Sequence, residues 1–309
     1  MLKIKSIVCA TLIGFAFVPH VLIGYTLPRV NLGSNNILDG GPIRPNPGFY
    51  WQEIFQYYHA DKFLNNEGCP LAGVKSPTFS SIVLVSQLVY QAKRSRMFRG
   101  AFGGVVSLPI VLSSHISKNF LNISDAGAGV GNLVLGGFLQ FNVINYKSRP
   151  LFIHRLELDV FLPVGTNKFP QKTTNPASIM TYIDPYWAAT LFLTEKCAAS
   201  WRMHYLWCAQ NKKTNIKPGQ TFHMNYSLEY NLFPHCWVAI NGYYLQQLKE
   251  STLCGVDIPH SKERVLAVGP GALYILPKEY FLFGYLYVEK LVHNRPQGIK
   301  AVVRLVKHF

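Results

Sequence analysis

The sequence is short of charged residues and of long apolar runs. Charged side chains make up 15% of its 309 residues, whereas a typical soluble domain has about 25%. This shortage indicates that much of the surface does not face water. Beyond the N-terminal segment, no apolar run reaches the roughly 20 residues that a transmembrane helix needs. A helical membrane bundle is therefore excluded, and a water-soluble all-β protein and a membrane β-barrel both stay open.

The motifs of a disulfide scaffold, a metal site and an enzyme are missing as well. The six cysteines contain no CxxC pair, which argues against a disulfide framework. Cys69 and Cys254 fall in expected outer loops and could pair in the oxidising cell envelope. His204 and Cys208 share a strand face, but four residues of strand hold them roughly 13 Å apart. We therefore expect no metal, no cofactor and no catalytic residue, with an envelope hydrolase as a remote alternative.

The first residues have the layout of a signal peptide. Lys3 and Lys5 precede an apolar run at 7–18, and Gly24 is a plausible last residue before cleavage. The alternative is an N-terminal membrane anchor, for which the run is shorter than the roughly 17 residues required. We expect residues 1–24 to be removed on export.

The net charge is +15, with basic residues gathered in expected turns. An exported chain rarely meets nucleic acid, so we expect no such partner. Basic turns at a membrane edge suit the phosphate-bearing headgroups of a lipid bilayer and of lipopolysaccharide. Solvated turns explain them equally well.

The exported part alternates between apolar and polar residues, as a strand with one apolar face does. In 221–232 the alternation is unbroken, with Phe222, Met224 and Leu228 on one face and His223, Asn225 and Glu229 on the other. A soluble sandwich could give the same pattern, so the number of strands must decide. We place twelve strands, at 48–58, 81–90, 99–113, 129–142, 151–162, 183–194, 197–209, 220–232, 236–248, 262–276, 280–292 and 298–309.

The connections between these strands alternate between long and short. Outer-membrane barrels show this arrangement, with long loops outside and short periplasmic turns. We therefore predict an all-β, transmembrane antiparallel β-barrel over residues 47–309, a single domain. An even strand count places both termini in the periplasm, and residues 25–46 form an irregular periplasmic lead-in. Phe309 ends an amphipathic strand and resembles the signal that the outer-membrane assembly machinery reads.

Several short pieces in a fixed order resemble the outer-membrane family named for the meta-pathway of phenol degradation. They include Pro47-Gly48-Phe49-Tyr50, Gly129-Val130-Gly131-Asn132-Leu133, Phe161-Leu162-Pro163-Val164-Gly165 and Asn294-Arg295-Pro296-Gln297-Gly298. The resemblance implies an outer-membrane barrel that passes small, often aromatic or hydrophobic molecules, and no catalytic residues. Val164 and Asn132 depart from the family pattern, where Thr and Asp are expected.

One set of residues is expected to face the lumen. Its members are Arg155, Glu157, Asp159, Arg202, His204, His223, Asn225, Glu229, Tyr285, Tyr287 and Glu289. Polar groups that line a pore select solutes by charge and hydrogen bonding, which favours a passive channel for a small solute. Alternatively, these groups pair with one another and plug the barrel, which would then have a structural or surface-interaction role through its long outer loops.

Overall fold

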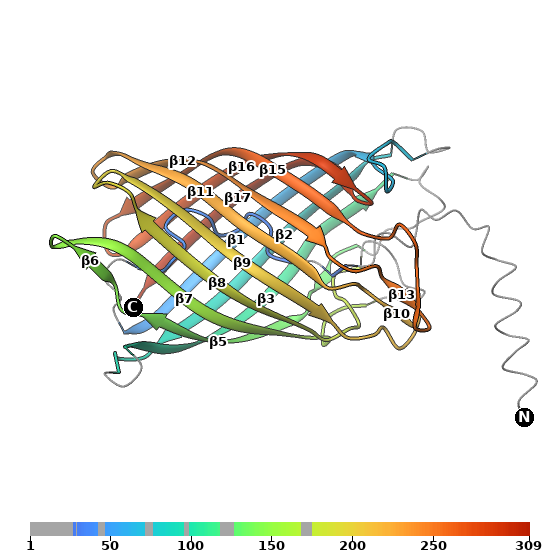
Figure 1. Cartoon of the computed structure of the whole chain (residues 1–309), viewed down its shortest axis with the longest axis horizontal. Coiled ribbons are helices and arrows are strands. Elements are labelled where there is room, and N and C mark those ends of the chain that lie inside the picture. Colours follow the sequence, from blue (N-terminus) through green and yellow to red (C-terminus); the bar gives the residue numbers. More distant parts are fainter. Residues whose placement is uncertain are drawn as a thin grey trace, which may run out of the picture.

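The computed structural model describes residues 27–28, 30–42, 47–71, 77–95, 99–117, 127–167 and 175–309. Twelve long antiparallel strands form a closed barrel (Figure 1). They are β1 (Gly48–Phe63), β2 (Phe79–Gln91), β3 (Gly100–Ile116), β5 (Leu133–Phe141), β7 (Arg149–Leu162), β8 (Tyr182–Phe192), β9 (Cys197–Cys208), β11 (Thr221–Phe233), β12 (Cys236–Gln247), β15 (Arg264–Leu276), β16 (Tyr280–His293) and β17 (Pro296–His308). Short strands are β4 (Gly129–Val130), β6 (Ile144–Tyr146), β10 (Ile216–Lys217), β13 (Thr252–Leu253) and β14 (Val256–Asp257). No helix in these ranges is long and apolar enough to cross a membrane.

Each long strand pairs with its neighbours in sequence, and β1 also pairs with β17. That last pairing closes the sheet and leaves no row of unpaired backbone groups, as hydrocarbon surroundings require. The prediction of an antiparallel barrel of twelve strands is confirmed, and each predicted strand coincides with an observed one. The ends differ by a few residues. β1, for example, continues to Phe63 through an irregularity between Ala60 and Lys62.

The outward face of the barrel is apolar. Leu156, Leu158, Leu228 and Leu286 are each about half exposed, whereas their inward neighbours Glu157 and Tyr287 are buried. Aromatic outward residues join them, among them Tyr205 and Tyr230. Side chains of a strand point to alternate faces, so one face forms the apolar outside of the barrel and the other forms the lumen.

Residues 30–42, here called the lumen segment, lie inside the barrel (Figure 1). The segment is irregular, as predicted, and residues 32–37 are all buried. It hydrogen-bonds to strands on opposite sides, with Ser34 bonded to Gln56 of β1 and Gly33 to Asn225 of β11. The expected lead-in outside the barrel is therefore corrected: the described part of 25–46 fills lumen space. Its Asn, Ser and Gly residues offer the bonds that polar side chains of the wall need.

The two ends of the described chain lie at opposite ends of the barrel. The backbone N–H of Leu27 donates to Glu263 near the start of β15, at the end that carries the longer loops. Phe309 bonds to Phe49 at the start of β1, at the end with the short turns. The start of β1 and the end of β17 share the short-turn end, whereas Leu27 lies at the long-loop end, because the lumen segment crosses the barrel before β1 begins. The expectation that both termini are periplasmic stays a prediction. Residues 1–24, expected to be a signal peptide, lie outside the described residues.

Candidate functional site

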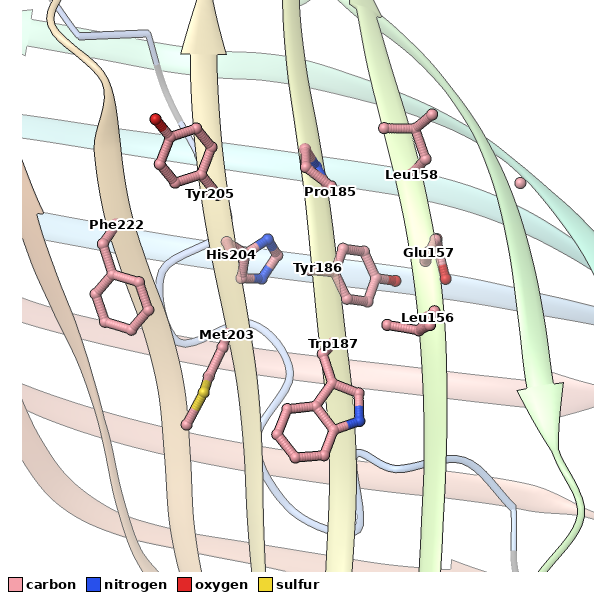
Figure 2. A pocket seen from close by; sticks show the side chains of 11 residues that line it. Leu156, Glu157, Leu158, Pro185, Tyr186, Trp187, Met203, His204, Tyr205 and Phe222 are labelled. Carbon is pink, nitrogen blue, oxygen red and sulfur yellow. The ribbon is translucent and has the colours of Figure 1, made fainter.

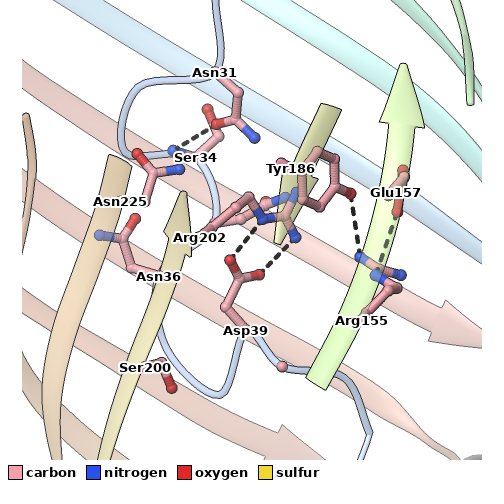
Figure 3. Close-up of polar contacts among 12 residues, drawn as sticks. Asn31, Ser34, Asn36, Asp39, Arg155, Glu157, Tyr186, Ser200, Arg202 and Asn225 are labelled. Carbon is pink, nitrogen blue, oxygen red and sulfur yellow. Dashed lines mark hydrogen bonds and ion pairs between the residues drawn. The ribbon is translucent and has the colours of Figure 1, made fainter. Parts of the chain in front are cut away.

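An ion pair connects the lumen segment to the middle of the wall (Figure 3). Nε and Nη2 of Arg202 on β9 donate to the two carboxylate oxygens of Asp39, at 2.7 and 2.8 Å. Both side chains are almost fully buried, and the guanidinium also lies 4.5 Å from the ring centre of Tyr186. A bidentate pair of this kind fixes orientation as well as charge. Arg202 therefore binds the lumen segment.

Three more of the predicted lumen residues hold the same segment. Asn225 accepts the N–H of Gly33 at 2.8 Å, and Glu229 accepts that of Leu38 at 2.9 Å. The Tyr287 hydroxyl donates to the Gly33 carbonyl at 2.7 Å. The segment has no secondary structure, so these side chains supply the partners that its buried backbone needs.

Arg155, Glu157 and Asp159 form a second polar group on β7. Nε of Arg155 lies 3.3 Å from Glu157, and Nη2 lies 3.5 Å from the Tyr186 hydroxyl. Asp159 borders a cavity described below. Arg155 and Glu157 thus pair within one strand, and Asp159 is the member of this group that meets open space.

Glu289 and Tyr285 lie on the other side of the barrel. Glu289 accepts hydrogen bonds at 2.7 Å from the hydroxyls of Tyr58 and Tyr243. Tyr285 is buried and stacks on Tyr287 at 6.1 Å between ring centres. Both residues fill and order the lumen rather than stand free in it.

The long-loop end has an anchor of its own. Glu263 receives the Leu27 N–H and also pairs with Arg295 at 2.6 Å. Burial opposes the charge of Arg295, but the carboxylates of Glu263 and Glu289 outweigh this and raise the pKa of Arg295 above its ordinary value. Arg295 therefore keeps its positive charge over the whole physiological pH range.

His204 and His223 come together with a third residue, Asp184 of β8. His204 Nδ1 lies 3.0 Å from one carboxylate oxygen of Asp184, and His223 Nε2 lies 3.4 Å from the other. The imidazole rings stack at 4.1 Å. Sequence reasoning missed this cluster because it compared positions along one strand, whereas the register pairs His204 with His223 across two strands.

A cavity of about 490 Å³ occupies the space that the lumen segment leaves open. One side of it is an apolar wall, which we define as Ile54, Val83, Val85, Pro109 and Val111 of β1, β2 and β3. The other side is formed by Asp159, Tyr186, Arg202 and the start of the lumen segment, and residues of the long-loop end complete it. The apolar wall was not among the predicted site residues. The available signal was the pair of short apolar runs, 82–85 in β2 and 108–112 in β3.

A groove of about 470 Å³ lies around Pro185 of β8 (Figure 2). Outward-facing Leu156, Leu158 and Tyr205 line it together with the buried His204. Proline has no N–H to give to the strand ladder, and the pairing of β8 with β9 lapses between Ile183 and Tyr186. The ladder is therefore interrupted here, as the ladder between β15 and β16 is between Val268 and Gly271.

Phe309 and the cysteines complete the account of the predicted residues. Phe309 is exposed at the short-turn end, with the Lys307 ammonium 5.7 Å from its ring centre. Cys69 and Cys254 are exposed free thiols. The structure therefore contains no disulfide between them.

A family model described as the "MetA-pathway of phenol degradation" matches residues 61–305. The chain belongs to this family. A search of the curated proteins found none that matches this chain. An outer membrane channel of Pseudomonas putida F1 is 17% identical, with a TM-score of 0.76 over 91% of this chain and 100% of that one. This likeness establishes the fold as that of an outer-membrane β-barrel, and hence a lipid bilayer as its surroundings.

Two further solved structures are less similar to this chain. The β domain of the Bordetella autotransporter BrkA has 9% identity and a TM-score of 0.48, over 85% of this chain and 100% of that one. A mutant of the TodX monoaromatic hydrocarbon channel has 11% identity and a TM-score of 0.47, over 86% and 91%. At these scores they add nothing to the first likeness.

Proposed function

We propose that the chain is a passive channel for small hydrophobic molecules in the outer membrane. The observation that carries this proposal is the cavity between the lumen segment and the apolar wall. Its volume, about 490 Å³, lies within the range of about 300–1,000 Å³ typical of small-ligand sites. Val83, Val85 and Val111 favour an apolar solute by removing its surface from water, and the concentration gradient supplies the driving force.

The orientation belongs to the same proposal. The long-loop end would face the cell exterior and the short-turn end the periplasm, as is usual for bacterial barrels. Loop residues such as Asn175 and Asn211 border the cavity, so a solute would enter from outside. Phe309 would lie on the periplasmic side as part of the signal for the assembly machinery. Lys217, 5.4 Å from the ring centre of Trp207, would meet lipopolysaccharide.

A second candidate function is a plugged barrel that acts through its outer loops. The observation that favours it is the set of bonds that hold the lumen segment, above all the ion pair of Asp39 with Arg202. In this case the lumen segment would stay in place, and the cavity would not connect the two ends of the barrel.

Uptake of 1-N-phenylnaphthylamine by whole cells separates the two candidates. The lipopolysaccharide leaflet slows the entry of this small aromatic probe, which fluoresces once it reaches lipid. Expression in a porin-deficient Gram-negative host should raise its uptake rate severalfold over cells with an empty vector. The heat-modifiable band of the outer-membrane fraction verifies that the barrel is folded. A folded protein that leaves the uptake rate unchanged would favour the plugged barrel.

A further inference from the structure

We propose that Asp184, His204 and His223 bind one divalent transition-metal ion of the zinc type. Their three ligand atoms lie within 4.8 Å of one another. In a tetrahedral site with ligand atoms about 2.1 Å from zinc, two ligand atoms lie about 3.4 Å apart, so side-chain rotations that bring the atoms closer by about 1.4 Å or less would suffice. Two imidazoles and a carboxylate are a ligand set that zinc commonly uses.

The register of three neighbouring strands produces this cluster. His204 of β9 and His223 of β11 are directly paired, and Asp184 comes from β8, on the other side of β9. All three side chains point to the lumen face. None is more than 2% exposed. Ionisable residues at membrane depth are costly to bury and most often have a function.

Part of the cluster lacks hydrogen-bond partners. His204 Nε2 and His223 Nδ1 bond to nothing within the described part of the chain. Each imidazole therefore has a nitrogen available beyond the one that faces Asp184. A buried polar atom needs a partner, and an ion bound between the two imidazoles would supply one.

The surrounding charges favour a divalent cation. Near the cluster, the carboxylates of Asp39, Glu157 and Asp184 outnumber the guanidinium groups of Arg155 and Arg202. Asp159 is directly paired with Asp184 across β7 and β8. The two arginines are engaged with Asp39 and Glu157, so neither neutralises Asp184. A cation bound between the imidazoles would neutralise the charge of Asp184.

The place of the cluster in the wall suggests what the ion does. Asp184 precedes Pro185, where the ladder between β8 and β9 lapses, and His204 lies where pairing resumes. An ion shared by the three residues would tie β8, β9 and β11 across this gap. It would thus replace, by coordination, the backbone bond that proline cannot make.

The test uses the full chain without a histidine tag, purified from outer membranes in detergent and stripped with EDTA. Titration with CoCl₂, followed by the cobalt absorption bands, should give one ion per chain, and ZnCl₂ should displace it. His204→Gln, His223→Gln and Asp184→Asn should each weaken binding at least tenfold. His260→Gln, at an exposed loop histidine, is the matched control and should bind as the unaltered chain does.

Zinc should also raise the temperature at which the unboiled gel band is lost, in the unaltered chain and in His260→Gln only. If a site variant fails to fold, copper bound to the unaltered chain should still show nitrogen coupling from two imidazoles by electron paramagnetic resonance. No stoichiometric ion, or binding that survives His204→Gln and His223→Gln, would overturn the proposal. The cluster would then be a hydrogen-bonded triad.

Discussion

The lumen has two sides of opposite chemistry on one fold. On β8, β9 and β11 the lumen face is a polar wall, made of Asp184, Thr190, Ser200, Arg202, His204, His223, Asn225 and Glu229. On β1, β2 and β3 it carries the apolar wall, with Gln56, Gln87 and Ser107 beside it. The lumen segment binds along the polar wall, and the cavity lies against the apolar one. Buried polar groups require partners, which the segment supplies, whereas valines require none and can border open space.

The largest expected effect comes from breaking the ion pair on the polar wall. Arg202→Met would leave Asp39 buried without its partner, which typically costs about 3–5 kcal/mol. The temperature at which the folded gel band disappears should fall markedly. Adding Asp39→Asn in the same chain should recover part of the loss, because the stranded charge is gone. An unchanged transition in the single variant would mean that Asp39 is not held by Arg202.

A smaller effect is expected when β16 loses one hydroxyl that holds the lumen segment. Tyr287→Phe loses the bonds to the Gly33 carbonyl and to Oδ1 of Asn36, and buried acceptors left unpaired cost about 1–3 kcal/mol. Tyr230→Phe is the matched control, because Tyr230 faces outward and should tolerate the change. Equal thermal stability of the two variants would contradict the role given to Tyr287.

On the apolar wall, the effect should fall on transport and not on stability. Val85→Gln places an amide on the cavity wall and should slow phenylnaphthylamine uptake about fivefold, since roughly 1 kcal/mol of apolar contact is lost. The gel transition should stay near that of the unaltered chain. A large loss of stability with unchanged uptake would show that Val85 belongs to packed core.

The smallest effect is expected where the segment faces the apolar wall. Ser34→Ala removes the hydrogen bond from Gln56 of β1, at the edge of the cavity. A hydrogen bond of this kind contributes about 0.5–1.5 kcal/mol, so the transition should shift only slightly. A shift as large as that of Arg202→Met would mean that the two walls hold the segment equally.

The same difference between the walls explains what the sequence could predict. Alternation was clear in 221–232 because β11 has lipid on one face and polar partners on the other. β2 and β3 alternate poorly because Val83, Val85 and Val111 face the lumen while Leu84, Leu88 and Leu112 face lipid. The twelve strands were therefore accessible from the sequence. The short apolar runs of β2 and β3 did not reveal which of their residues border the cavity.

Long-range contacts were beyond the reach of pattern reading. Nothing in the composition of 25–46 shows that Asp39 meets Arg202, since 163 residues separate the pair in sequence. The meeting of Asp184 with His204 and His223 depends on strand register, which one sequence does not fix. The ion pair and the histidine cluster both depend on which residues the fold brings together, and the sequence alone does not show this.

A pair of variants on one strand tests the central claim most directly. Val111→Phe adds a ring on the cavity side of β3, and Val106→Phe adds the same ring on its lipid side. Phenylnaphthylamine uptake should fall severalfold with Val111→Phe and stay unchanged with Val106→Phe, both variants showing the folded, heat-modifiable band. Equal uptake by the two folded variants would contradict passage of the solute along the apolar wall.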